Sequence, residues 1–163
     1  MVKRKTLAAA ECPVARALDV IGDWWSLLIV RDAFDGIRRF GEFQQNLGVA
    51  KGILATRLRS LVDAGVLEVV PASDGTAYGE YVLTEKGRGL FHVVVSLRQW
   101  GEAYLYSPGE KHSVLVDQAG NAVGQLVLPS LDGTALNAAE TTVRKATDPI
   151  KRKSRSATVA GRS

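Results

Sequence analysis

Hydrogen-bond donors for anionic ligands gather in one short stretch of the chain, "KGILATRLRSLVDAG" (residues 51–65). Lys51, Arg57 and Arg59 carry positive charge, Thr56 carries a hydroxyl, and no acidic residue of the stretch precedes Asp63. Ammonium, guanidinium and hydroxyl groups bind phosphate oxygens and the edges of nucleic-acid bases. The stretch therefore indicates a nucleic-acid contact, although a solvated basic surface would have the same composition.

The apolar residues of this stretch have helical spacing. Each residue of a helix turns by about 100°, so Leu54, Leu58 and Leu61 share one face and predict a buried stripe. The opposite face carries small, polar or charged residues: Gly52, Thr56, Arg59 and Asp63. Lys51 lies between the two faces, and Arg57 flanks the stripe. The pattern predicts a helix that packs through its leucines and exposes a basic side.

Cys12 is the second candidate for chemistry. It precedes Pro13, which suits the first turn of a helix, and unpaired backbone N–H groups at a helix start lower the pKa of a thiol. This placement predicts a redox-sensitive residue, and a small, inert, partly buried residue is the alternative. Because Cys12 is the only cysteine, oxidation could give an intersubunit disulfide, a mixed disulfide or a sulfenic acid.

The remaining residues capable of chemistry form no recognisable site. The chain has no nucleophile motif, phosphate-binding loop or pair of carboxylates, so we expect neither an enzyme nor a bound cofactor. His92 and His112 are far apart, which predicts no metal site. Three tryptophans predict packing in a core or between subunits, with an aromatic ligand pocket as the alternative: Trp24, Trp25 and Trp100.

Length and charge predict one domain with an appendage. The 163 residues are 46% hydrophobic and 23% charged, which is ordinary for a globular protein. No apolar run approaches the roughly 20 residues needed to span a membrane, and the N-terminus lacks an apolar signal region, so we expect a cytoplasmic protein. The net charge of +4 comes from residues 151–163, which hold five basic residues and no acid. We expect residues 150–163 to be a disordered basic tail.

The apolar pattern predicts helices first and strands later. Helices are expected over residues 13–22, 23–36, 39–48 and 50–64, with Val14, Leu18 and Ile21 buried by the first. Two strands are expected over 66–72 and 80–84, joined by a turn over 73–79. A long helix is expected over 85–106, and two short strands are expected around the turn "QAGN" within 113–128; residues 130–149 are weakly patterned.

This order of elements predicts an α+β fold, mainly α, of the winged helix-turn-helix type. The third and fourth helices are joined by a tight turn with Gly48, and the second helix of such a pair lies in the DNA major groove. The expected parts are an N-terminal arm (1–11), the winged domain (12–106), a β-rich extension with a small hairpin (107–149) and the tail. The long helix is expected to serve dimerisation.

Three stretches resemble the HxlR-type regulators, relatives of the MarR group. They are "CPVARALDVIGDWWSLLIVRD" from Cys12, "RFGEFQQNLGVAKGILATRLRSLVDAGVLE" from Arg39 and "YVLTEKGRGL" from Tyr81, followed by Trp100-Gly101. The resemblance covers Cys12 to about Leu105. It implies a homodimeric bacterial transcription factor that responds to oxidants or electrophiles. It also implies that residues 50–64 read DNA and that Cys12 is the redox-sensing cysteine.

Two features depart from the family pattern. The wing turn "PASDGTAYGEY" lacks the basic residues that touch DNA in many members, so phosphate contacts are expected from Arg38 and Arg39, and from Lys86 and Arg88. The extension from His112 to Leu136 has no cysteine, so no metal role is expected there. The expected DNA-binding residues are therefore Arg38, Arg39, Lys51, Gly52, Thr56, Arg57, Arg59 and Lys86.

The sequence as a whole predicts a DNA-binding transcriptional regulator, in particular a repressor. Its expected partners are operator DNA, a second copy of the chain and an electrophile or small ligand, with no membrane. The first helix and the long helix are both expected to supply the dimer interface, through Val14, Leu18 and Ile21 and through Phe91, Val94, Val95, Leu97 and Leu105. One alternative is a repressor that senses a metabolite in a pocket between its dimer helices and DNA-binding lobes. Another is a winged-helix protein-interaction module that has lost DNA binding.

Overall fold

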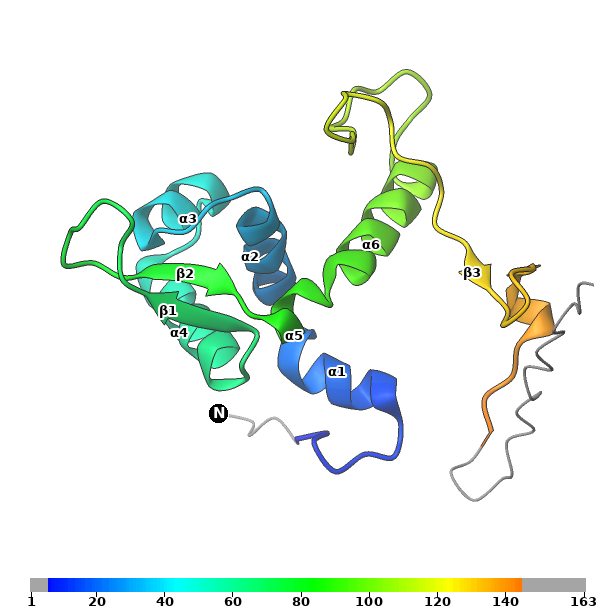
Figure 1. Cartoon of the computed structure of the whole chain (residues 1–163), viewed down its shortest axis with the longest axis horizontal. Coiled ribbons are helices and arrows are strands. Elements are labelled where there is room, and N and C mark those ends of the chain that lie inside the picture. Colours follow the sequence, from blue (N-terminus) through cyan, green and yellow to red (C-terminus); the bar gives the residue numbers. More distant parts are fainter. Residues whose placement is uncertain (1–5, 145–163) are drawn as a thin grey trace, which may run out of the picture. The chain divides into compact units, whose positions relative to one another are not determined.

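The computed structural model describes residues 6–144, which fall into two compact units that divide between Leu126 and Val127. The first unit holds the winged helix-turn-helix (Figure 1). Its elements are α1 (Pro13–Ile21), α2 (Trp24–Phe34), α3 (Phe40–Leu47), α4 (Lys51–Asp63), β1 (Leu67–Val70), β2 (Glu80–Leu83), α5 (Glu85–Arg88) and α6 (Phe91–Tyr104). The predicted fold class is confirmed, whereas the division at Leu126 differs from the boundary predicted after residue 106.

The core of the first unit lies where α2, α3 and α4 meet the strands. The predicted stripe of Leu54, Leu58 and Leu61 is fully buried there, against Ile29 of α2 and Phe43 of α3. Burying a leucine or phenylalanine side chain contributes about 1.5–3 kcal/mol. The stripe therefore fixes which side of α4 remains exposed.

α1 buries less than its pattern predicts. Ile21 is buried, but Val14 and Leu18 are 65% and 46% exposed. The prediction that all three would be buried is wrong for these two, because α1 lies against the unit only through its C-terminal end. An exposed apolar face remains on the rest of the helix.

The turn between α3 and α4 depends on a glycine. Gly48 has a φ of 61°, and its N–H donates to the Gln44 carbonyl at 3.0 Å. Only glycine adopts this left-handed conformation without strain. Val49 then enters the core, and α4 begins two residues later, so the two helices are held as one rigid pair.

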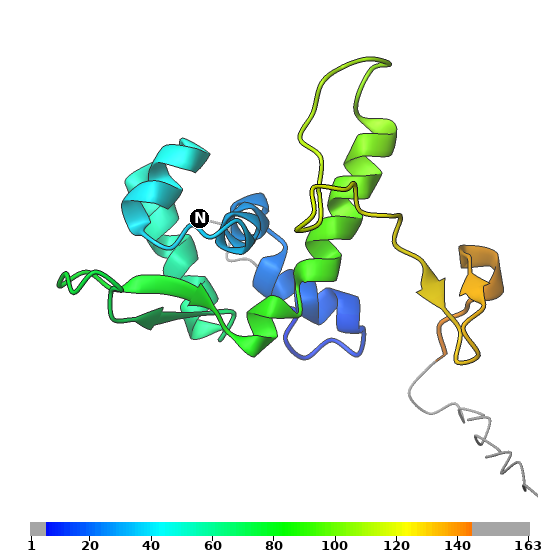
Figure 2. The same ribbon diagram turned by 45° about the horizontal axis from the view of Figure 1, so that its top comes forward.

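The wing is an antiparallel pair of strands, with Leu67 opposite Leu83 and Val70 opposite Glu80. Residues 71–79 join the strands in a loop that projects beyond them (Figure 2), and Tyr78 and Gly79 of this loop line a pocket with Phe40 of α3. The Tyr81 N–H donates to the Arg38 carbonyl at 2.8 Å. This bond ties β2 to the segment that leads into α3.

A close contact explains the sequence "LTEKG" after β2. The Thr84 hydroxyl donates to the Gly65 carbonyl at 2.6 Å and accepts the Gly87 N–H at 3.1 Å. A Cβ at Gly87 would lie 2.1 Å from the Val66 carbonyl oxygen. Glycine is therefore required where α5 passes over the end of α4.

The prediction of one long helix over residues 85–106 is wrong, because the structure forms two helices there. α5 ends at Arg88 and α6 begins at Phe91. The Leu90 N–H bonds to the Gly87 carbonyl three residues back, at 3.0 Å, which is a tighter turn than an α-helix makes. Gly87 and Gly89 both weaken helical propensity at this point. α6 then continues away from the bundle of α1–α4 (Figures 1 and 2).

The residues after α6 form less sheet than predicted. Within 113–127 a single bridge pairs Val116 with Ala122. The turn between them is held by the Asp117 carboxylate, which accepts the N–H groups of Ala119 and Asn121 at 2.9 Å. Hydrogen bonds from Asn121 lower the pKa of Asp117. The segment is fixed to α6 by the Gln99 side chain, which bonds Gly124 and Leu126.

The described part of the second unit (127–144) contains the ladder that the sequence did not predict. β3 (Leu128–Pro129) pairs with β4 (Ala135–Leu136), and the short helix η1 (Ala138–Glu140) follows. The predicted tail over 150–163 lies outside the described residues. No helix within residues 6–144 has the length and apolar character to cross a membrane.

Candidate nucleic-acid interface

The outer side of α4 presents the residues that the sequence placed there. Lys51, Gly52, Thr56 and Arg59 are all exposed. Thr56 donates its hydroxyl proton to the Gly52 carbonyl at 2.8 Å, which leaves its oxygen lone pairs free to accept. The backbone at Gly52 is open, since a Cβ added there would meet no atom within 4 Å. A ligand can therefore approach the helix closely at this point.

Lys51 and Arg59 carry the free positive charge of this face. No hydrogen bond or ion pair engages either side chain among the residues that the structure describes. Their charges are therefore available to a phosphate or to an acceptor on a base edge.

Arg57 is already paired. Its Nε lies 3.2 Å from Asp23 Oδ1, and its side chain is 36% exposed. Asp23 is the N-cap of α2, where it accepts the Ser26 N–H at 3.1 Å and the Ser26 hydroxyl. Arg57 thus faces the body of the unit as well as solvent. Asp23 stands at the start of the helix predicted over residues 23–36, but nothing local in the sequence predicts its partner on α4.

Arg39 bridges two acids of the wing. Its Nη2 lies 2.6 Å from Asp74 Oδ2 and 3.4 Å from Glu80 Oε1. Glu80 is only 4% exposed and accepts the N–H and the hydroxyl of Ser73, at 3.2 and 2.9 Å. Arg38 approaches the same glutamate at 3.7 Å while remaining largely exposed.

These contacts shift the ionisation of the wing. Hydrogen bonds from Thr76, followed by the one from Arg39, lower the pKa of Asp74 to about 2. Hydrogen bonds from Ser73 lower the pKa of Glu80, with a smaller contribution from Arg39. The hydrogen bond to Asp74 raises the pKa of Arg39. The positive and negative charges of the wing therefore compensate one another. Arg39 is engaged in holding the wing loop to β2 before any contact with DNA.

Lys86 and Arg88 cap the ends of neighbouring elements. The Lys86 ammonium donates to the Ala64 carbonyl, at the end of α4, at 2.6 Å. The Arg88 guanidinium donates to the Leu83 carbonyl, at the end of β2, at 2.8 Å. Cations at such carbonyls stabilise the element that ends there.

Cys12 lies apart from this face, at the start of α1. It is exposed, occupies the N-cap, and makes no capping hydrogen bond with its side chain. The predicted position at a helix start is confirmed, and the thiol there is exposed.

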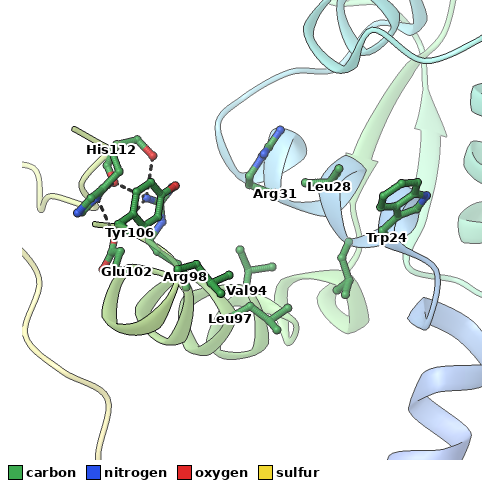
Figure 3. A pocket seen from close by; sticks show the side chains of 13 residues that line it. Trp24, Leu28, Arg31, Val94, Leu97, Arg98, Glu102, Tyr106 and His112 are labelled. Atoms are coloured by element: carbon green, nitrogen blue, oxygen red, sulfur yellow. Dashed lines mark hydrogen bonds and ion pairs between the residues drawn. The ribbon is translucent and has the colours of Figure 1, made fainter. Parts of the chain in front are cut away.

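A groove of about 690 Å³ runs between α2 and α6 (Figure 3). Trp24, Leu28 and Leu97 make its walls mostly apolar. At one end Arg98 lies 3.5 Å from Glu102, and the Tyr106 ring lies against His112. Within residues 6–144 no group of histidine, cysteine or acidic side chains is arranged to hold a metal ion.

Known proteins resemble the chain over the winged unit. A sequence profile of the HxlR-like helix-turn-helix family matches residues 20–108. The uncharacterised HTH-type regulator Rv3095 of Mycobacterium tuberculosis is 50% identical over 95 residues, which cover 58% of this chain and 60% of that protein. The match thus spans about 60% of that curated relative's own length.

Several solved structures are also similar to this chain. PA1607, a candidate transcription factor, is 54% identical with a TM-score of 0.82, over 86% of this chain and 99% of that one. The redox regulator HypR in its oxidised form is 34% identical with a TM-score of 0.52, over 56% of this chain and 96% of that one. Reduced YodB of Bacillus subtilis, a transcriptional regulator, is 29% identical with a TM-score of 0.51, over 61% of this chain and 98% of that one. This chain belongs to the HxlR-like helix-turn-helix family.

Proposed function

We propose that the protein is a sequence-specific DNA-binding transcriptional regulator that reads the major groove with the outer face of α4. The observation that carries the proposal is the pair of free cations, Lys51 and Arg59, on the second helix of a helix-turn-helix. Gly52 and Thr56 on the same face allow close approach and hydrogen bonding. A repressor acting on its operator in the cytoplasm is the specific form of this proposal.

A salt-titrated shift assay on the promoter of its own or a neighbouring gene tests the proposal. Specific binding should exceed binding to unrelated DNA by at least about 1,000-fold and weaken steeply with salt. A winged-helix module that has lost DNA binding would give weak binding with no preference for sequence. That result would favour the protein-interaction alternative.

The regulator is proposed to act as a homodimer, because a two-fold pair reads two half-sites about one helical turn apart. α6 exposes an apolar seam at spacings of four, three and four: Val93, Leu97, Trp100 and Tyr104. α1 adds the exposed Val14 and Leu18. Of the residues predicted for the interface, Ile21 and Val95 are buried within the chain and are thus unavailable to a partner.

Cys12 is proposed as the effector site of the regulator. Its exposure at a helix start supports a reactive thiol, and a similar structure is that of a redox regulator. The groove between α2 and α6 supports the alternative effector, a small apolar ligand, because its size and lining suit one.

A further inference from the structure

The ion pair between Arg57 and Asp23 joins the proposed DNA-reading helix to the corner between α1 and α2. Asp23 follows the end of α1 by two residues and caps α2. Arg57 lies in the second turn of α4. Among residues 6–144, no other ion pair connects α4 to another element.

The geometry makes the two charges depend on each other. Arg57 Nε is shut off from solvent and has no hydrogen-bond partner within the described chain, so Asp23 Oδ1 at 3.2 Å supplies its compensating charge. Asp23 is itself held in place by the N–H and hydroxyl of Ser26, a residue that is 1% exposed. Removing either charge leaves the inward-facing atom of the other without its partner, so the remaining side chain, which is partly exposed, turns toward solvent.

We propose that Arg57 is a positioning residue: the leucine stripe seats α4 on the core, and the ion pair with Asp23 sets the rotation of α4 relative to the α1–α2 corner. Arg57 therefore acts on DNA affinity through the placement of Lys51 and Arg59, and Asp23 contributes equally. This inference rests on the proposed function of α4.

Substitution of the aspartate distinguishes positioning from direct contact, because the two predict opposite signs. Asp23→Asn removes a negative charge near a DNA-binding helix, so electrostatics alone would tighten binding. Asparagine also remains a good N-cap for α2. If the pair positions α4, Asp23→Asn instead weakens specific binding by roughly three- to thirtyfold, a typical coupling between paired residues.

The arginine side of the pair is tested by the salt dependence. Arg57→Gln should weaken specific binding to the same extent as Asp23→Asn, and the double variant should lose no more than either single one. The slope of affinity against salt should remain that of the wild type. A phosphate contact through Arg57 would instead reduce that slope by about one.

Asp35→Asn is the matched control, because Asp35 is exposed at the C-terminal end of the same helix, α2, and no hydrogen bond or ion pair engages its side chain in the described chain. Its affinity should equal or slightly exceed that of the wild type. Circular dichroism and thermal unfolding establish that each variant folds, and Arg57→Lys, which keeps the cation, should recover part of the affinity.

The outcomes separate this inference from the proposed function. A wild type that prefers no DNA sequence overturns both. A wild type that binds specifically, together with an Asp23→Asn variant that behaves like Asp35→Asn, overturns the positioning role alone. A shallower salt slope in Arg57→Gln has the same effect, since it would make Arg57 a phosphate contact.

Discussion

At the scale of single residues, the cations predicted to touch DNA differ in how far the protein itself occupies them. Arg39 and Arg57 each face a carboxylate, and Lys86 donates to the end of α4. A cation already paired must exchange one partner for another when it binds phosphate, so it adds little net affinity. Lys51 and Arg59 have no such partner in the described chain and should dominate binding.

Arg59→Ala should reduce affinity for the specific site by about 1–3 kcal/mol if its guanidinium pairs with a guanine. The loss should be much smaller for unrelated DNA, because base contacts alone carry sequence preference. Fluorescence anisotropy on both DNAs measures the difference. An equal loss on both would assign Arg59 to the phosphate backbone.

Lys51→Ala should weaken binding to all sequences alike. A lysine on phosphate releases one counterion, so its removal should reduce the slope of log affinity against log salt by about one. The measurement is the same titration at several salt concentrations. Unchanged affinity and slope would show that Lys51 stays in solvent when DNA is bound.

Cys12→Ser should abolish the response of DNA affinity to diamide or a quinone. Modification of a thiol at the start of α1 would favour one dimer arrangement over another, and moving from mostly bound to mostly free takes a few kcal/mol. The shift assay with treated and untreated protein measures this. An equal response in wild type and variant would transfer the effector role to the groove between α2 and α6.

At the scale of elements, the wing should loosen in acid. Asp74 and Glu80 have pKa values below their ordinary range in the folded protein. Their contribution to stability is therefore complete above about pH 5 and decreases as the pH falls toward about 2. The free energy of unfolding of wild type and Asp74→Asn, measured by urea at several pH values, should converge in acid. A constant difference would show that the wing bonds do not depend on this charge.

Gly87→Ala should destabilise the junction between α4, the wing and α5. The added Cβ would lie 2.1 Å from the Val66 carbonyl oxygen, and relieving such a clash costs about 1–3 kcal/mol. Gly41→Ala in α3 is the control, because a Cβ there meets no atom within 4 Å. Thermal unfolding should separate the two variants. Equal stability of the two variants would mean that the junction accommodates the added Cβ without loss of stability.

The elements that the sequence predicts well are those fixed by local pattern. The leucine stripe of α4, the glycine after α3 and the two wing strands with the turn between them each follow from neighbouring residues. The break between α5 and α6 was missed because the apolar helical period continues through Leu90. Gly87 and Gly89 were its local signal, and the close approach of Gly87 to Val66 comes only with the fold.

The site was predicted less completely, for the same reason. Periodicity places Lys51 and Arg59 on an outer face but does not reveal that Arg57 meets Asp23, which is 34 positions earlier in the chain. Arg39 and Glu80 are likewise brought together only by the folded wing. Partners that are distant in sequence decide which cations remain free.

At the scale of the whole molecule, the exposed apolar seam on α6 should bring two copies together. Trp100 and Tyr104 are 56% and 73% exposed, with ring centroids 5.8 Å apart. Light scattering at micromolar protein should give twice the chain mass of 17.5 kDa. Trp100→Glu should shift the mass toward the monomer by placing a charge in the interface. A monomeric wild type would contradict the dimer.

Selection from a pool of random DNA tests most directly whether the outer face of α4 reads sequence. Wild type and the double variant Lys51→Ala/Arg59→Ala, with equal thermal stability, would each be taken through the same rounds. We expect the wild type to enrich one motif with two-fold symmetry and the double variant to enrich none. Enrichment of the same motif by both proteins would contradict the proposed role of α4, because another surface would then recognise the DNA.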